Sequence, residues 1–213
     1  MMTSLPHYPR EVPRSPMVEV RNEQRRKRIL EATVRIIGRE GPGAVTHRAV
    51  AAEAGVPLAA TTYYFASKEA LFNEALTLSV WSDLAELEVL ARSMEQSPAS
   101  VEAFARFIAV FLAAQLRRRR TTIVAQYELV LEAARHSSMR EAARASTETY
   151  VRLCETMLEK IGSADPVGDA RLLVALMDGL LLDQMSATRS QFDVDALAQQ
   201  LRRFIAGLLL APT

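Results

Sequence analysis

The chain has 213 residues, of which 49% are hydrophobic and 24% are charged, so it can bury a sizeable core and remain soluble. Its single cysteine excludes an intramolecular disulfide, and no apolar run is long enough to span a membrane. Alanine, leucine, arginine and glutamate abound, a composition that predicts an all-α protein. Because the N-terminal segment lacks the apolar core of a signal peptide, we expect a cytoplasmic protein.

The charges are unevenly distributed along the chain. Through Lys68 there are eleven Lys and Arg residues against six Asp and Glu, a net of +5, and the remainder has fifteen against nineteen, a net of −4. A basic first third joined to an acidic remainder is typical of a DNA-binding part attached to a part that does not touch DNA. Chance asymmetry is the alternative.

Residues 1–20 hold four prolines and two arginines, and we expect a flexible tail that is either passive or reaches an adjacent DNA groove. An apolar stripe at helical spacing predicts a first long helix over 22–40. Cations crowd the start of this helix: Arg21, Arg25, Arg26, Lys27 and Arg28. Because cations there oppose the helix macrodipole, we favour a nearby phosphate backbone as their explanation over a solvated basic face.

The segment that follows predicts two short helices joined by a tight turn. Thr46 is a favourable N-cap, and the stretch His47–Ala54 is rich in alanine. Gly55 can adopt the left-handed conformation that ends a helix, and Pro57 suits the first turn of the next one. Two helices that cross closely at a glycine turn indicate a helix-turn-helix, whose second helix enters the DNA major groove.

At this motif the sequence resembles the TetR family of bacterial transcription regulators. The matching residues are Thr46, Arg48, Val50, Ala51, Ala54, Gly55, Val56, Tyr63, Tyr64, Phe65, Ser67, Lys68, Glu69, Ala70, Leu71 and Phe72. The resemblance is specific over 22–72 and is otherwise one of helical layout. It implies a DNA-binding domain of three helices over 21–67 and a helical effector-binding and dimerisation domain over 68–213.

Two residues of the motif depart from the family pattern. The family usually has Leu or Ile at the position of Thr61 and Tyr at the position of Thr62. We therefore expect a weaker apolar anchor at Thr61 and a shorter phosphate-contacting arm at Thr62.

The expected recognition helix, over 57–65, offers few groups that discriminate bases. Leu58, Ala59 and Ala60 can contact only a thymine methyl, whereas Arg48 can bind guanine through its bidentate fork. Side chains suited to phosphates are Thr46, Thr62, Tyr63, Tyr64 and Lys68. Tyr63 could equally belong to the core. The resemblance implies DNA contact at Thr46, Arg48, Leu58, Ala59, Ala60, Thr62, Tyr64 and Lys68.

Apolar positions at helical spacing predict further long helices over 68–91, 100–116, 122–135, 139–161, 169–187 and 193–210. In the first of these, the residues expected to face the core are Leu71, Phe72, Ala75, Leu78 and Trp81, with Leu84, Leu87 and Leu90 continuing the stripe. The four arginines at 117–120 suit a solvated helix end, where cations are favourable, better than a nucleic-acid contact. Cys154 is expected to be an inert core residue.

The last two predicted helices are too apolar to be left exposed. They are covered either within one subunit or in an interface of four helices with a twofold mate. The resemblance favours a homodimer through these two helices.

The resemblance also implies that the second domain holds a small-molecule effector. Candidate contacts are the aromatic, methionine and acidic residues of its helices: Trp81, Phe104, Phe107, Phe111, Tyr127, Met157, Met177 and Asp178. Each could instead be plain core. If Asp178 is buried among its apolar neighbours it needs a partner, which could be a ligand, an arginine or a hydroxyl.

No phosphate-binding glycine loop and no hydrolase or zinc-protease pattern is present, and the three histidines lack metal-ligand spacing. We therefore expect no catalytic residues, no metal and no cofactor. The resemblance implies a repressor that binds a near-palindromic double-stranded DNA operator as a dimer and is released by an effector. The alternatives are an activator or effector-independent regulator and, more remotely, a helical enzyme or interaction module.

Overall fold

The computed structural model describes residues 16–94, 99–186 and 193–210, with side chains described in these ranges outside 16–19 and 82–94. Over this part of the chain there are helices and turns but no strand, which confirms the predicted all-α class. The helices are α1 (Pro16–Glu40), α2 (His47–Ala54), α3 (Leu58–Tyr64), α4 (Lys68–Met94), α5 (Val101–Arg118), α6 (Arg120–Arg135), α7 (Arg140–Lys160), α8 (Pro166–Ser186) and α9 (Val194–Leu210). Short 3₁₀ turns, Pro42–Ala44 and Ser137–Met139, follow α1 and precede α7.

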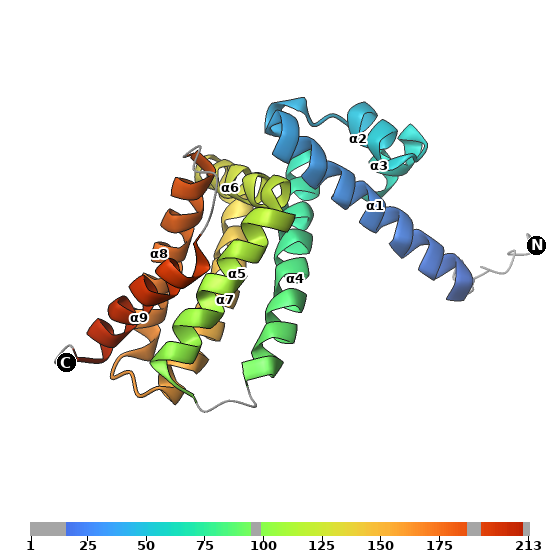
Figure 1. Cartoon of the computed structure of the whole chain (residues 1–213). Coiled ribbons are helices and arrows are strands. Elements are labelled where there is room, and N and C mark those ends of the chain that lie inside the picture. Colours follow the sequence, from blue (N-terminus) through green and yellow to red (C-terminus); the bar gives the residue numbers. More distant parts are fainter. Residues whose placement is uncertain (1–15, 95–98, 187–192, 211–213) are drawn as a thin grey trace, which may run out of the picture.

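The helices form a small head and a larger body. The head, α1 to α3, projects from one side of the body, and α8 and α9 lie on the opposite side (Figure 1). Helix α4 leads directly from the head into the body, which is completed by α5 to α9 (Figure 1). None of the helices in the described ranges is both long and apolar enough to cross a bilayer.

The hydrophobic core of the head continues into the body. Buried residues of α1, α2 and α4 form one cluster with residues of α6, and among its members are Ile29, Ile37, Val50, Leu71, Leu76 and Leu129. The two parts of the chain on either side of Lys68 therefore share one core. A second cluster fills the body, where α5 packs mainly on α9 and α7 on α8.

A close helix crossing reinforces this connection. Gly38, near the end of α1, lies against the first turn of α6. A methyl group added at Gly38 would overlap the backbone carbonyl oxygen of Thr121 and would lie 2.6 Å from its Cγ2 atom. Only glycine lets the two backbones approach this closely.

Two helices begin at a proline, three or more residues earlier than their sequences predict. Helix α1 starts at Pro16, so the expected tail is wrong for residues 16–20, and residues 1–15 lie outside the described part of the chain. Helix α8 starts at Pro166 instead of at Asp169. The backbone N–H that proline lacks would have no partner in the first turn of a helix. Pro16 and Pro166 therefore fit as the first residues of α1 and α8, where we expected both helices to begin after the proline.

The prediction that Trp81 faces the core is wrong, because its side chain is 67% exposed. The expected stripe advanced in steps of three residues from Phe72, and nine residues at about 100° each amount to two and a half turns. Trp81 therefore lies on the side of α4 opposite Phe72, while Leu76 and Val80 are buried. The side chains of Leu84, Leu87 and Leu90 lie outside the described residues.

The arginine run spans the junction of α5 and α6. Arg117 and Arg118 are exposed in the last turn of α5, as expected for a solvated helix end. Arg120 instead donates a 2.7 Å hydrogen bond to the carbonyl oxygen of Met185, in the last turn of α8, and Arg119 is half-buried. The expected solvation therefore holds for Arg117, Arg118 and Arg120, which are exposed, and Arg120 in addition ties α6 to the end of α8.

The α1–α6 crossing predicts the effect of Gly38→Ala. Alanine gains up to about 1 kcal/mol over glycine inside a helix, but the overlap with Thr121 should cost about 1–3 kcal/mol more than that gain. We expect a lower free energy of unfolding in urea titrations. Gly43→Ala is the control, because no atom outside the neighbouring residues lies within 4 Å of its added methyl group. A Gly38→Ala protein as stable as wild type would contradict the close crossing.

Candidate DNA-binding surface and ligand cavity

The helix-turn-helix is closed by local hydrogen bonds, as its sequence predicts. The Thr46 hydroxyl oxygen accepts a 3.1 Å hydrogen bond from the Ala49 N–H at the start of α2. Gly55 ends this helix in the left-handed conformation, with φ 62° and ψ 43°, and the next N–H, of Val56, donates to the Ala51 carbonyl at 3.0 Å. These bonds fix the angle at which α3 leaves α2.

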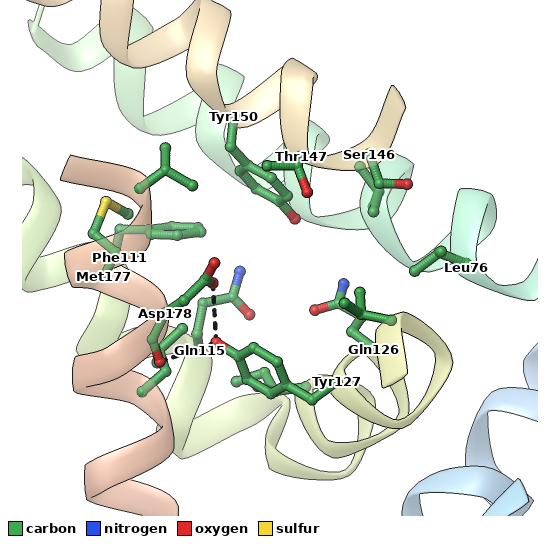
Figure 2. A pocket seen from close by; sticks show the side chains of 15 residues that line it. Leu76, Phe111, Gln115, Gln126, Tyr127, Ser146, Thr147, Tyr150, Met177 and Asp178 are labelled. Carbon is green, nitrogen blue, oxygen red and sulfur yellow. Dashed lines mark hydrogen bonds between the residues drawn. The ribbon is translucent and has the colours of Figure 1, made fainter. Parts of the chain in front are cut away.

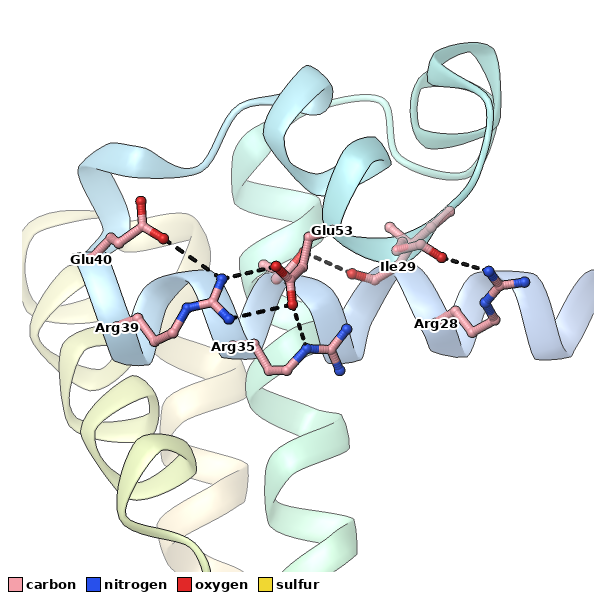
Figure 3. A network of polar contacts seen from close by, with 8 residues as sticks. Arg28, Ile29, Arg35, Arg39, Glu40 and Glu53 are labelled. Carbon is pink, nitrogen blue, oxygen red and sulfur yellow. Dashed lines mark hydrogen bonds and ion pairs between the residues drawn. The ribbon is translucent and has the colours of Figure 1, made fainter.

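Helix α1 also holds the end of α2, through Arg28. One guanidinium nitrogen of Arg28 donates to the carbonyl oxygens of Ala54 (2.6 Å) and Gly55 (3.1 Å), two of the acceptors that a helix C-terminus leaves free (Figure 3). The positive charge also favours the negative end of the helix dipole. Arg28 therefore positions the turn that leads into α3.

A charged cluster ties the outer side of α2 to α1. Glu53 accepts hydrogen bonds from Arg35 (2.7 Å) and Arg39 (2.8 Å), side chains one helical turn apart on α1 (Figure 3). These hydrogen bonds, first from Arg39 and then from Arg35, lower the pKa of the Glu53 carboxyl from 4.5 to about 2. Glu53 is therefore ionised at neutral pH and bridges two cations.

Three of the five cations at the start of α1, Arg26, Lys27 and Arg28, have partners within the protein. Arg26 pairs with Glu74 on α4 and lies over the ring of Phe65, 5.7 Å from its centroid. Lys27 is 3.8 Å from Glu31, and Arg28 binds the end of α2. A phosphate is thus not needed to explain these three residues, and for Arg21 and Arg25 it stays a prediction.

Helix α3 is anchored through Thr61 and Phe65, which is buried just after its end. The Thr61 side chain is 0% exposed, and its hydroxyl donates a 2.8 Å hydrogen bond to the Leu58 carbonyl. Threonine thus fills the position that we expected to anchor the helix weakly, with its polar atom satisfied. Helix α3 begins at Leu58, and Pro57 is the residue just before it instead of a member of its first turn.

Most of the residues expected to contact DNA are exposed on the head. They are Thr46, Arg48, Leu58, Ala59, Thr62, Tyr63 and Lys68. Ala60 and Tyr64 are half-buried against the core of the head, and the Tyr64 hydroxyl donates to Asn22 on α1 at 3.0 Å. Tyr63 packs edge-to-face on Tyr64 and points outward, so the more accessible of the two hydroxyls belongs to Tyr63.

The start of α4 presents a further cationic group. Ser67 caps this helix by accepting a 3.1 Å hydrogen bond from the Ala70 N–H. Lys68 is exposed, with its ammonium 5.2 Å from the centroid of the Phe72 ring. A helix N-terminus with a lysine beside it suits a phosphate group.

The body contains a cavity of about 130 Å³ among α4, α5, α6, α7 and α8. It is lined by Leu76, Val80, Phe111, Gln115, Ile123, Gln126, Tyr127, Val130, Ser146, Thr147, Tyr150, Val174, Met177, Asp178 and Leu181 (Figure 2). The exposed lining residues, Val130, Thr147 and Asp178, come from α6, α7 and α8. The cavity therefore opens to solvent between these three helices.

The structure brings half of the expected effector contacts to this cavity. Phe111, Tyr127, Met177 and Asp178 line it. Phe104 is buried in the core of the body, Phe107 and Met157 pack against that core, and exposed Trp81 lies in shallow surface grooves beside α4. Cys154 is buried in the same core, and burial raises its thiol pKa to about 12, so it is unreactive as expected.

Asp178 has a hydroxyl as its partner. The Tyr127 O–H donates to its Oδ1 atom at 3.0 Å (Figure 2). Part of Asp178 is exposed, but burial of its carboxyl against the cavity wall raises its pKa, an effect that the Tyr127 hydrogen bond reduces. Burial and then the charge of Asp178 raise the pKa of Tyr127, which stays protonated and serves as a donor.

Several cavity residues escaped the sequence analysis because their positions depend on distant elements. Leu76 and Val80 line the cavity from α4, and Gln126, Thr147 and Tyr150 line it from α6 and α7 (Figure 2). One had a signal: Gln115 follows Phe111 by four residues, so it lies on the apolar face of α5. A lone amide on such a stripe marks a polar group inside the body.

The head surface, the body cavity and the helices between them define a helical DNA-binding regulator. A family model described as "Bacterial regulatory proteins, tetR family" matches residues 29–75, and another described as "Tetracyclin repressor-like, C-terminal domain" matches residues 99–211. The chain therefore belongs to the TetR family of DNA-binding transcription regulators. Members of this family bind DNA and small-molecule ligands as dimers, and they are regulators and not enzymes.

Solved structures and a characterised regulator are similar to this chain. The multidrug binding protein EbrR complexed with imidazole is 31% identical over 89% of this chain and 97% of that chain, with a TM-score of 0.65. A TetR-family member from Streptomyces coelicolor A3 (SCO1917) is 29% identical over 88% of this chain and 99% of that chain, with a TM-score of 0.68. The HTH-type transcriptional dual regulator CecR of Shigella flexneri is 41% identical over 58 residues, which are 27% of this chain and 26% of that protein.

The Glu53 cluster predicts a pH-dependent contribution to stability. Because the folded pKa of Glu53 is about 2 and the ordinary value is 4.5, the folded state gains from ionised Glu53 above pH 4.5 and loses this gain as the pH falls toward 2. Thermal unfolding of wild type and Glu53→Gln should therefore differ most near neutral pH and converge in acid. Glu141→Gln, which removes an exposed ion pair within α7, is the control and should change little. A constant difference at all pH values would contradict the prediction.

Proposed function

We propose that this regulator is a repressor that binds a near-palindromic operator as a dimer and is released by a small molecule bound in the body cavity. The observation that carries the proposal is that α4 and α6 line the cavity and also complete the core of the DNA-binding head. A ligand that moves either helix therefore acts on the head through direct packing.

On the DNA side, α3 enters the major groove and Arg48 reads a guanine through its paired donors. Leu58 and Ala59 contact thymine methyl groups, and Thr46, Thr62, Tyr63 and Lys68 bind phosphates. The support for this assignment is that these side chains are all exposed on the head. Tyr64, whose hydroxyl is bonded to Asn22, has a structural role beside any DNA contact.

The dimer forms through α8 and α9. Helix α8 exposes an apolar stripe, Leu172, Ala175, Gly179 and Leu182, at helical spacing on the side away from the buried Leu173 and Val174. Its small central residues allow a second helix to approach closely. A twofold mate then carries the second head, and DNA requires the two heads to lie about 34–36 Å apart, one turn of the duplex.

The effector acts by a difference in affinity. A ligand releases DNA only if it binds the conformation with spread heads better than the DNA-bound one. Support for a small-molecule ligand comes from EbrR, which is similar over nearly its whole length and is described in complexes with imidazole and with ethidium. As a regulator of transcription, the chain acts in the cytoplasm.

An activator that uses the same head surface is the second candidate. The observation in its favour is that the related CecR is described as a dual regulator. Both candidates require sequence-specific DNA binding, and transcription of a reporter behind the selected operator, with and without the regulator, separates them.

Selection from a random duplex pool at moderate salt, followed by sequencing, tests the proposed DNA reading. We expect a palindromic motif. Arg48→Ala should relax base choice at one position of each half-site by about 1–3 kcal/mol, because a base contact is lost. Lys68→Ala is the matched variant and should weaken all sequences alike and reduce the salt slope by about 1. Equal losses on selected and scrambled DNA for Arg48→Ala would refute its role, and no enrichment at all would refute sequence reading.

The dimer interface is tested with Leu182→Glu. A charge on the exposed stripe of α8 should be buried without a partner in the dimer, so we expect monomers in sedimentation velocity at micromolar concentration. Leu131→Glu is the control, because Leu131 on α6 is a leucine of similar exposure, 52% against 47%. Dimers of Leu182→Glu as tight as those of wild type would place the interface elsewhere.

A further inference from the structure

Gln115 is buried with its amide group aimed into the body cavity. Its side chain comes from α5 and is 2% exposed. Within the described part of the chain, neither the amide nitrogen nor the amide oxygen has a hydrogen-bond partner. A buried polar atom without a partner costs about 1–3 kcal/mol, so an amide with two such atoms is an expensive feature to keep inside a core.

The cavity that this amide enters has both apolar and polar lining residues. Phe111, Val174 and Leu181 are among the apolar ones. The amide of Gln115 lies close to the Tyr127–Asp178 pair, and Tyr150 and Thr147 extend toward it from α7 (Figure 2). Because the Tyr127 hydroxyl already donates its hydrogen bond to Asp178, this pair does not supply the donor that the Gln115 oxygen lacks.

The size of the cavity limits what can meet the amide. Its volume is about 130 Å³, and an apolar protein cavity of about 150 Å³ is sufficient for benzene. The cavity is slightly smaller but opens to solvent between α6, α7 and α8, so the largest ligand we expect it to hold in this conformation has one ring. A planar ring can lie against Phe111 with one polar edge toward Gln115.

A primary amide is complementary to an edge that carries one acceptor beside one donor. Glutamine makes such a paired contact with the donor and acceptor edge of adenine. Both groups of Gln115 are neutral. An anion in the cavity would meet the Asp178 carboxylate, and a cation would pair with Asp178 at the exposed edge of the cavity and not with the Gln115 amide. The complementary ligand is therefore neutral.

We propose that the body cavity recognises a neutral, planar ligand of one ring with an N–H and a C=O on adjacent atoms, a cyclic amide, through two parallel hydrogen bonds to Gln115. The Gln115 oxygen accepts from the ring N–H, and its nitrogen donates to the ring carbonyl. This inference rests on the proposed function, in which the same cavity is the effector site, and it assigns the chemical class of the effector.

Calorimetric titration of the full chain with 2-pyridone tests the inference. 2-Pyridone is a planar cyclic amide of one ring, and N-methyl-2-pyridone, which lacks the N–H, is its matched control. Toluene serves as an apolar ring of similar size. We expect saturable binding of 2-pyridone at one site per chain, with at least tenfold weaker binding of N-methyl-2-pyridone and toluene.

Gln115→Leu should reverse this preference. The variant should lose at least tenfold in affinity for 2-pyridone, gain affinity for toluene and melt at a higher temperature without ligand, because the unpaired amide is gone. Gln115→Met, of similar volume, keeps the test valid if the leucine variant folds poorly. Gln199→Leu, at an exposed position of α9, is the control and should keep the wild-type preference. Unchanged 2-pyridone affinity in both Gln115 variants, or no preference over the N-methyl compound, would overturn the inference.

Operator binding in the same samples separates this inference from the proposed function. Wild-type protein that binds its selected operator but not 2-pyridone would overturn the cyclic-amide ligand and leave the DNA-binding proposal standing. Binding of 2-pyridone without any loss of operator affinity would support the Gln115 site and contradict its role in release. Protein that binds 2-pyridone but selects no DNA sequence would support the site while the proposed function fails.

Discussion

The structure depends on the sharing of one hydrophobic core between the DNA-binding head and two helices of the body. The three helices of the head do not form a separate core, because buried residues of α4 and α6 complete it. The close crossing of α1 and α6 at Gly38 adds a rigid contact to this packing. Because cores are tightly packed and deform little, a shift of α4 or α6 would strain the packing of the head.

The polar groups of the two parts have different roles. In the head, Arg28 and Glu53 are satisfied by partners on another helix, so they fix the geometry of the helix-turn-helix. In the body, the amide of Gln115 is buried without such partners in the described residues. A buried polar group without a hydrogen-bond partner in the protein indicates a site where a ligand supplies that partner. The head is therefore built to hold one arrangement, whereas the cavity retains unused hydrogen-bonding capacity.

Local signals made the helix-turn-helix predictable, and long-range packing set the limit of prediction. The cap of Thr46 and the turn at Gly55 depend on backbone geometry within a few residues, so the local sequence is sufficient to predict both. Trp81 was misplaced because a helical pattern followed in steps of three drifts around the axis. The partners of Arg28 and the position of Gln115 in a cavity depend on helices far away in the chain, which no local pattern specifies.

The division of labour within α3 has a consequence for evolution. Thr61, which anchors this helix, points inward, and its hydroxyl donates a hydrogen bond to the backbone carbonyl of Leu58. The side chains of Leu58, Ala59 and Tyr63 are exposed. The inner side sets where the helix lies, and in the proposed function the outer side contacts DNA, so the two sides can change independently. Paralogues of such a regulator can acquire new target sequences by exchanging outward side chains, at little expense to the fold that presents them.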